Sequence, residues 1–284
     1  MLTAADLPEG ITLERLQEWY DRFRFYRHPP SREELIAWIR QFTPEHQVIG
    51  AKVLDHVILV SDADIQQGYH NALAALNGWS AVENLREGRW AFVGLGGQAE
   101  SGQAMLHMFR EANGLTSDHH QALFVTLADL PEMRLTARDT VVFVDDFSGT
   151  GDQFTARWQI FRELISSEAK TYLFLAVATS RALARLGNLD DVQVKVERVL
   201  GPENDIFSNA NQDFSENEKA SLLIYCRKAD KSNPRGWGAC GLLLVISRKT
   251  PNNSVPILHA RNRRWTSVFP RKLKLVGAPP RQAA

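Results

Sequence analysis

From Arg89 onward, short apolar runs alternate with amphipathic stretches. WAFVGL precedes GQAMLHMFREA, VVFVDD precedes FTARWQIFRELI, and YLFLAVA precedes SRALARL; further apolar runs are ALFVTL, VQVKVERVL and GLLLVIS. Runs rich in Val, Leu and Phe are typical of strands buried on both faces, and the amphipathic stretches between them are typical of covering helices. The pattern predicts an α/β domain over residues 86–284, with a mainly parallel sheet flanked by helices.

Residues 1–85 follow a helical pattern instead. Over 13–23 the apolar residues recur at three- and four-residue spacing, which predicts an amphipathic helix. A capping box at Ser31–Glu34 predicts the start of a second helix, and two more are predicted over 44–60 and 61–76. We expect an all-helical N-terminal region that either covers the main core or docks a partner.

Composition narrows the class of protein. The chain has 284 residues, of which 44% are hydrophobic, which favours a globular protein over a disordered, collagenous or coiled-coil one. The two cysteines, Cys226 and Cys240, lack the spacing of a zinc or redox motif, and we expect them to be reduced, partly buried thiols. No signal-peptide pattern and no apolar stretch of the ~20 residues that a spanning helix needs is present. The expected location is cytoplasmic, without membrane contact.

The charge is balanced overall but unevenly distributed. The chain has 33 basic and 33 acidic side chains, yet residues 248–284 contain nine Lys or Arg and no Asp or Glu. A basic segment of this kind favours a phosphate-bearing partner. A solubilising end that pairs with an acidic surface is an equally open interpretation.

The loop after the apolar run VVFV has the clearest chemistry. In parallel sheets ligands bind at the carboxyl ends of the strands, and this strand is followed directly by Asp145 and Asp146 and then by a turn with two glycines. The N–H groups of a glycine turn at a helix N-terminus bind phosphate. Adjacent carboxylates accept hydrogen bonds from vicinal hydroxyls or hold a divalent metal. The loop therefore combines the groups that a phosphorylated sugar needs.

We predict that this loop binds a ribose 5-phosphate. Asp145 and Asp146 would orient the ribose hydroxyls, and the turn would hold the phosphate, although Asp152 would repel it unless its side chain turns away. An ordinary strand followed by a capped helix is the alternative, but it would not require the acid pair. The turn residues of the predicted site are Ser148, Gly149, Thr150, Gly151, Asp152 and Gln153.

The segment VVFVDDFSGTG resembles the phosphoribosyl pyrophosphate (PRPP) signature of type I phosphoribosyltransferases, in which four apolar residues, two acids and two linking residues precede a small-residue turn with Thr-Gly. The resemblance implies a phosphoribosyltransferase-like fold that binds PRPP or a nucleotide. It also implies Mg²⁺ as the cofactor, with Asp145 and Asp146 as its ligands and as the catalytic residues. The implied reaction is displacement of pyrophosphate at ribose C1 by a base, or cleavage of a nucleotide.

One departure from the family pattern bears on catalysis. Gly149 stands where purine-salvage members carry an acidic residue that is proposed as a general acid or base. Orotate-type members have a non-acidic residue there, so activity is compatible with this glycine. A nucleotide-binding regulator without turnover is the alternative, and a nucleic-acid-binding subunit is a third interpretation.

A second glycine-rich loop, GLGGQAESG, follows the run WAFV. In the family, the loop after the first core strand binds pyrophosphate, and the resemblance assigns this role to Gly96, Gly97 and Ser101. A phosphate-binding P-loop is disfavoured because Gln103 replaces the required Lys. A dinucleotide fingerprint is also weak here, since the nearest suitable acid, Asp129, comes later than the usual spacing of about 20 residues. A tight turn without a ligand stays open.

The C-terminal part carries a third set of candidates. Asn252 and Asn253 could read a base edge or a ribose, Trp265 or Trp237 could stack on a ring, and the nearby arginines could contact nucleic-acid phosphates. A Pro-Asn turn with exposed arginines is an equally open interpretation of the same residues.

The order of a strand, TPNNS, an Arg-rich segment and Trp-x-x-x-Phe-Pro-Arg resembles the C-terminal part of phosphoribosyltransferase-like proteins of bacterial conflict systems, including retron-associated ones. The resemblance implies an effector in antiphage defence. Its implied partner is a reverse transcriptase with its RNA–DNA product, contacted through the basic C-terminal segment.

Overall fold

The computed structural model describes residues 6–95, 102–165 and 168–271. The chain forms two compact units. One, here called the sheet unit, is Val60–Gln212, and the other, here called the two-segment unit, combines Met1–Leu59 with Asp213–Ala284. No helix in the described part of the chain is long and apolar enough to cross a membrane.

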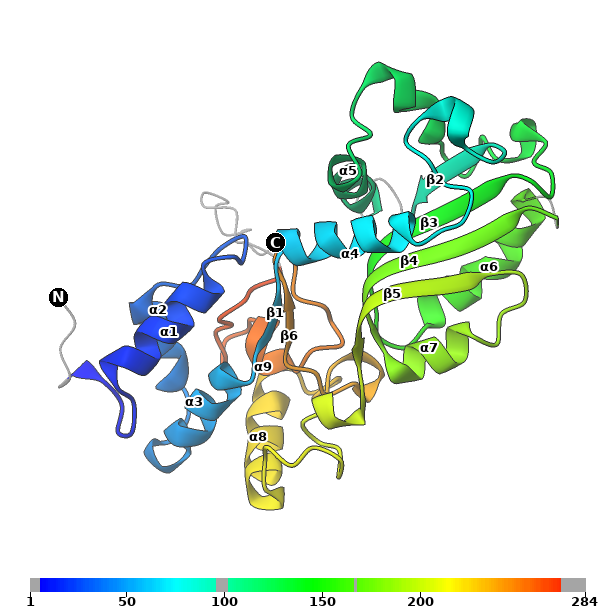
Figure 1. Ribbon diagram of the computed structural model, residues 1–284. Coiled ribbons are helices and arrows are strands. Elements are labelled where there is room, and N and C mark those ends of the chain that lie inside the picture. Colours follow the sequence, from blue (N-terminus) through cyan, green and yellow to red (C-terminus); the bar gives the residue numbers. More distant parts are fainter. Residues whose placement is uncertain (1–5, 96–101, 166–167, 272–284) are drawn as a thin grey trace, which may run out of the picture. The chain divides into compact units, whose positions relative to one another are not determined.

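The sheet unit contains a four-stranded sheet in the order β2-β3-β4-β5, and Figure 1 shows the strands side by side in that order. All neighbouring strands are parallel. The predicted α/β class is therefore confirmed. The strands are β2 (Trp90–Gly94), β3 (Thr140–Ser148), β4 (Lys170–Thr179) and β5 (Gln193–Leu200).

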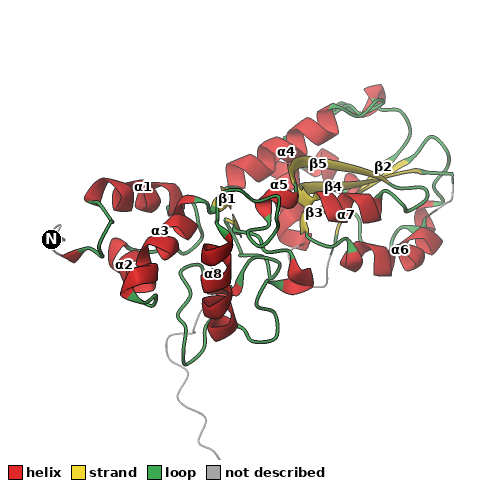
Figure 2. Ribbon diagram, turned by 90° about the horizontal axis from the view of Figure 1, so that it is seen from below, coloured by secondary structure: helices red, strands yellow, loops and turns green. Residues whose placement is uncertain are grey.

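Helices cover both faces of this sheet (Figure 2). On one face, α4 (Asp62–Ala74) packs on β4 and β5, and α5 (Gly102–Ala112) packs on β2 and β3. On the other face lie α6 (Asp152–Leu164) and α7 (Ser180–Leu186). The carboxyl ends of β3 and β4 lead into α6 and α7, as the sequence pattern predicts.

Alternating side chains of the strands form the core on both faces. Phe143 of β3 stacks on Phe161 of α6, with ring centroids 5.3 Å apart. Phe92 of β2 is in register with Val142, the residue before Phe143, and therefore points to the opposite face. Its ring centroid lies 4.7 Å from that of Phe109 of α5. Because successive strand residues point to opposite faces, the continuous apolar runs supply both layers at once.

Three predicted elements differ from the structure. The region 44–60 is not one helix: it contains a 3₁₀ turn at Pro44–His46, α3 (Gln47–Asp55) and β1 (Ile58–Val60). The run ALFVTL forms a single parallel bridge, Phe92 with Phe124, after a 3₁₀ helix over Asp118–Leu123. The run GLLLVIS contributes β6 (Leu244–Ile246), which pairs with β1 in a separate two-stranded sheet.

The two-segment unit is mainly helical, and its second helix starts at the predicted cap. Ser31 and Glu34 form the capping box of the second helix. Its helices are α1 (Leu13–Phe23), α2 (Arg32–Ile39), α3, α8 (Glu216–Ala229) and α9 (Pro256–His259).

The division into units differs from the predicted boundary at residue 85. The core of the two-segment unit joins both ends of the chain: the indole N–H of Trp38 donates to the carbonyl of Ile257, 219 positions later, at 2.9 Å. The ring of Trp38 also contacts Trp265 edge-on. The C-terminal segment therefore completes the N-terminal core, and no local sequence pattern reports such a distant pairing.

Both cysteines are buried and free, as the sequence predicts. Burial raises the pKa of Cys226 above its ordinary value. A buried thiol of this kind is a weak nucleophile, so Cys226 acts as a core residue.

Asp139 joins the starts of β2 and β3. Its buried carboxylate accepts the backbone N–H of Arg89 (2.7 Å) and of Thr136 (2.8 Å), and it forms an ion pair with the Arg89 guanidinium (2.8 Å). Burial alone would raise the pKa of Asp139, but the bonds from Arg89 and Thr136 outweigh burial and hold that pKa at about 2.

Asp139→Asn is expected to destabilise the protein by about 2 kcal/mol at neutral pH. Because the folded pKa lies below the ordinary value, this stabilisation is present above about pH 4 and is lost as the pH falls towards 2. Urea unfolding of both proteins between neutral pH and pH 2 measures the effect. The gap in unfolding free energy should close over this window, and a constant gap would contradict the assignment.

Candidate functional site

The predicted acid pair lies near the carboxyl end of β3, which has β2 on one side and β4 on the other. Asp145 pairs in register with Leu175 of β4. The five strand residues up to Val144 are buried, whereas Asp145 and Asp146 are half-buried. The backbone N–H of Asp146 donates to Oδ1 of Asp145 at 2.9 Å. The two carboxylates therefore stand where the core ends and the surface begins.

Tyr69 of α4 supports the acid pair from within the sheet unit. Its hydroxyl donates to the backbone carbonyl of Asp145 at 2.9 Å. Burial, and then the negative charges of Asp146 and Asp145, raise the pKa of Tyr69 well above its ordinary value, so its hydroxyl stays a donor. The sequence does not predict this role, because Tyr69 is only one apolar position of a helical pattern.

The turn after β3 ends at a glycine that begins α6. Gly151 is the N-cap of α6, with φ +76°, and as a glycine it has no side chain with which to cap the helix. By contrast, α1, α2, α4, α7 and α8 each begin at a Ser or Thr whose hydroxyl accepts a first-turn N–H. The Thr150 hydroxyl accepts the N–H of Asp152, the first residue of α6, at 3.3 Å. The N-cap residue itself supplies no side-chain acceptor, so the first turn of α6 can take a further acceptor such as a phosphate oxygen.

Thr179, at the end of β4, fixes this turn. Its hydroxyl donates to the carbonyl of Gly149 at 2.7 Å and accepts the N–H of Ala182 at 3.0 Å, which caps α7. One buried hydroxyl thus joins the predicted phosphate turn to the neighbouring strand-to-helix loop. Thr179 was not among the predicted site residues; the signal for it in the sequence is a Thr between an apolar run and a helical pattern.

Thr179→Val is expected to lower the unfolding free energy by about 1–2 kcal/mol, because an N-cap bond and the tie to Gly149 are lost together. Thr179→Ser keeps the hydroxyl and should lose much less. Urea unfolding of the three proteins measures the difference. Equal losses in both variants would show that the methyl group, and not the hydroxyl, stabilises this region.

Asp152 forms an ion pair with an arginine of the neighbouring helix α7. Its Oδ1 lies 2.6 Å from Nη1 of Arg185 on α7, and both side chains are about half exposed. A Cβ on Gly151 would lie 3.3 Å from the Arg185 side chain. The ion pair offsets the negative charge that Asp152 would present to a phosphate. Gln153 follows as an exposed residue in the first turn of α6.

The structure describes the residues on both sides of the second predicted loop, up to Leu95 and from Gly102 onward. Gly96, Gly97 and Ser101 lie outside the described residues. The N–H of Leu95 donates to the carbonyl of Val144 at 3.1 Å. A Cβ on Gly102 would lie 1.7 Å from the carbonyl oxygen of Leu95, so the backbone returns tightly to the end of β2. Both ends of the loop are therefore next to the β3 residue that precedes the acid pair.

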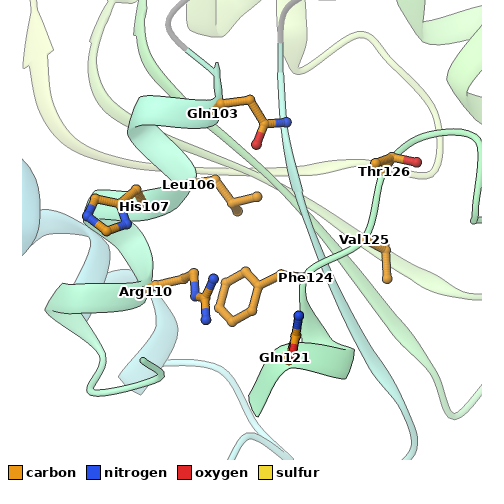
Figure 3. A pocket seen from close by; sticks show the side chains of 8 residues that line it. All are labelled: Gln103, Leu106, His107, Arg110, Gln121, Phe124, Val125 and Thr126. Atoms are coloured by element: carbon orange, nitrogen blue, oxygen red, sulfur yellow. The ribbon is translucent and has the colours of Figure 1, made fainter. Parts of the chain in front are cut away.

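A separate cavity of about 340 Å³ lies between α5 and residues 121–126 (Figure 3). The guanidinium of Arg110 stands over the ring of Phe124, 4.5 Å from its centroid. Phe124 forms an isolated parallel β-bridge with Phe92 of β2, and β2 pairs with β3 on its other side. None of the predicted site residues that the structure describes lines the cavity, so it is separate from the acid pair.

The C-terminal candidates belong to the two-segment unit. The amide of Asn253 donates to the carbonyl of Trp237 at 3.0 Å and is buried, and the carbonyl of Asn252 accepts the N–H of Trp237. These contacts favour a structural turn around Trp237, which itself is half exposed. Trp265 is buried, with its indole N–H on the carbonyl of Ile257, so it presents no face to a ligand.

The acid pair fits a metal that arrives with its substrate. No group of three or more His, Cys, Asp or Glu that could hold a metal occurs among the described residues. Mg²⁺ in phosphate-binding sites takes one or two carboxylates and completes its coordination with substrate phosphates and water. Asp145 and Asp146 match such a partial donor set.

A parallel sheet with an acid pair and a glycine-capped helix at its carboxyl edge is the arrangement of a phosphoribosyltransferase-like α/β protein. Comparison with protein families bears this out: the family model PRTase-CE matches residues 35–271, which span most of the chain. The chain therefore belongs to the PRTase-CE family. A search of curated proteins finds no match.

Proposed function

We propose that this chain binds PRPP or a nucleotide in the loop between β3 and α6. Asp145 and Asp146 hold the 2- and 3-hydroxyls of the ribose, and residues 148–153 hold the 5-phosphate. The observation that carries the proposal is the order of features along one loop: two half-buried carboxylates are followed by a left-handed glycine, and this glycine is the N-cap of a helix. Membership of the PRTase-CE family supports the same ligand class.

Pyrophosphate would bind beside the ribose, on the loop after β2. Gly96, Gly97 and Ser101 are the proposed ligands. The contact of Leu95 with Val144 supports this assignment, because it holds the start of the loop against the strand that carries the acid pair. The close approach of Gly102 to Leu95 holds the other end there.

If the chain is an enzyme, its reaction is displacement of pyrophosphate at C1 of PRPP by a nitrogenous base, or the reverse, in which pyrophosphate displaces the base of a nucleotide. Asp145 and Asp146 stabilise the positive charge that develops on the sugar ring as the bond to C1 breaks. The bound phosphate fixes the sugar for attack. When bound, Mg²⁺ neutralises the leaving pyrophosphate, and Asp145 and Asp146 are the residues that would hold it.

Binding without turnover is the second candidate function. Residue 149 is a glycine whose carbonyl accepts the Thr179 hydroxyl, so this position has no acidic side chain to protonate or deprotonate a base. A nucleotide-binding regulator needs the acid pair and the phosphate turn but not that acid.

Calorimetry with PRPP, in Mg²⁺ and then in excess chelator, tests the ligand. We expect binding that requires Mg²⁺ and is competed by pyrophosphate. Pyrophosphate release measured over a panel of purine and pyrimidine bases then separates the two functions. Release with one base identifies an enzyme, and binding without release for any base favours the regulator. Absence of binding to PRPP and to all nucleotides tested would overturn the proposal.

We also propose that the chain acts as an effector in bacterial antiphage defence beside a reverse transcriptase. The TPNNS and Arg-rich segments support this role through their resemblance to conflict-system proteins. Co-purification with the product of a neighbouring reverse-transcriptase gene, and phage plaque counts with and without the intact acid pair, test it. Equal plaque counts in both strains would contradict it.

A further inference from the structure

Exposed cations gather where the end of α8 meets the loop 261–264. The side-chain amide of Asn262 donates to the carbonyls of Lys228 (2.9 Å) and Ala229 (2.8 Å), which places this loop on the last turn of α8. The exposed cations on the two segments, here called the basic surface, are Arg227, Lys228, Lys231, Arg261, Arg263 and Arg264.

The loop holds its arginines on a fixed backbone. Oδ1 of Asn262 accepts the N–H of Arg264 at 2.6 Å, and the backbone N–H of Asn262 donates to the carbonyl of Trp265 at 3.0 Å. Trp265 is buried beside Trp38. Each anchor uses backbone or amide groups, so the guanidinium groups of the loop have no part in holding it.

The following residue is clamped as well. The side chain of Gln41 accepts the N–H of Thr266 at 2.7 Å and donates to the carbonyl of Thr266 at 2.9 Å. The loop is therefore tied down at both ends, on α8 and next to α2. A segment that served only to solubilise the chain would not need this construction.

The charge of the basic surface is not neutralised within the described residues. None of its six cations forms an ion pair with a described side chain. Asp230 is the adjacent carboxylate in the chain, and its Oδ1 accepts the N–H groups of Ser232 and Asn233. Glu216 and Glu218 lie at the opposite end of α8, about 14–18 Å along the helix from Arg227 and Lys228.

We propose that the basic surface binds the phosphate backbone of a nucleic acid without sequence preference. Cations in the last turn of a helix stabilise the helix itself, which explains Arg227 and Lys228 but not the loop arginines. A cluster of exposed cations can neutralise several phosphates at once, and release of condensed counterions drives such binding. Guanidinium groups also offer phosphate two parallel hydrogen bonds.

Fluorescence anisotropy of the full chain with a labelled oligothymidylate and with a labelled mixed-sequence duplex tests the proposal. Affinity should fall steeply as salt rises from about 50 to about 200 mM. The double variant Arg263→Gln/Arg264→Gln should bind more weakly and reduce the slope of log K against log salt by about 1.4–1.8, that is, by about 0.7–0.9 for each cation removed.

A matched control removes the same charge elsewhere. Arg24→Gln/Arg138→Gln replaces two exposed arginines outside the basic surface and should leave affinity and slope close to those of the parent chain. An equal loss of affinity in the two double variants would overturn the proposal, because it would show that only the net charge of the chain matters. No binding to either probe at low salt, or binding to anionic vesicles or polyglutamate but not to nucleic acid, would also overturn it. PRPP calorimetry on Arg263→Gln/Arg264→Gln tests the proposed function separately, because its result does not depend on nucleic-acid binding.

Discussion

Replacing both Asp145 and Asp146 with asparagine is expected to weaken PRPP binding by about 100-fold or more. Each carboxylate would lose a charge-assisted hydrogen bond to a ribose hydroxyl, worth about 1.5–3 kcal/mol, and about 1.4 kcal/mol corresponds to a tenfold change in affinity. Any Mg²⁺-dependent part of the binding should disappear at the same time. Calorimetry with and without Mg²⁺ measures both effects.

The chain offers a matched control for this experiment. Asp190 and Asp191 are a second adjacent acid pair, and they precede β5 at the amino edge of the sheet. Asp190→Asn/Asp191→Asn removes the same charge from the sheet unit and should leave PRPP binding unchanged. If both double variants lose affinity equally, or if neither loses any while the urea midpoints stay unchanged, the assignment of the acid pair is wrong.

Gly102→Ala should be among the most destabilising single substitutions in the sheet unit. A Cβ at this position would lie 1.7 Å from the carbonyl oxygen and 2.3 Å from the carbonyl carbon of Leu95, and both are backbone atoms that a rotamer change cannot move. Overpacking of this kind costs about 3 kcal/mol, since the end of β2 or the start of α5 must shift. Urea unfolding monitored by tryptophan fluorescence measures the loss.

Gly114→Ala separates close approach from backbone conformation. Gly114 has φ +66°, but a Cβ there would meet nothing within 4 Å. Its substitution should cost only the left-handed conformation, about 1–2 kcal/mol. A loss at Gly102 no larger than the loss at Gly114 would mean that the two loop ends are not held as closely as the structure describes.

The parts of the fold that local patterns encode were predictable from the sequence. The run Val141–Val144 with its acid pair specifies a buried strand that ends at the surface, and β3 has that burial profile. Ser31 and Ser61 specify helix starts through capping boxes, and both boxes are present. Each of these features depends on residues within a few positions of one another.

Long-range pairing was not predictable in the same way. The run GLLLVIS has the pattern of any buried strand, and nothing in it indicates that β6 pairs with β1 rather than with the main sheet. The residues that support the candidate site also form contacts with residues far away in the sequence. Tyr69 reaches the carbonyl of Asp145 from 76 positions away, and Thr179 reaches Gly149 from 30. Their residue types are common in helices and caps, so only the fold identifies their roles.

Asp152 illustrates how a third residue can change the interpretation of a motif. From the sequence, its carboxylate opposes a phosphate at the start of α6. In the structure Arg185, from the next helix, pairs with it at 2.6 Å. The net charge of the turn is therefore set by two loops together, which the motif alone does not contain.

A comparison of ribose 5-phosphate with 2-deoxyribose 5-phosphate by calorimetry tests the central claim most directly, because the two sugars differ only in the 2-hydroxyl, one of the two hydroxyls that the acid pair would bind. Loss of one hydrogen bond to a carboxylate, about 1.5–3 kcal/mol, predicts about 10- to 100-fold weaker binding of the deoxy sugar to the parent chain. In Asp145→Asn/Asp146→Asn this preference should shrink. Equal affinity of the parent chain for the two sugars would contradict the account.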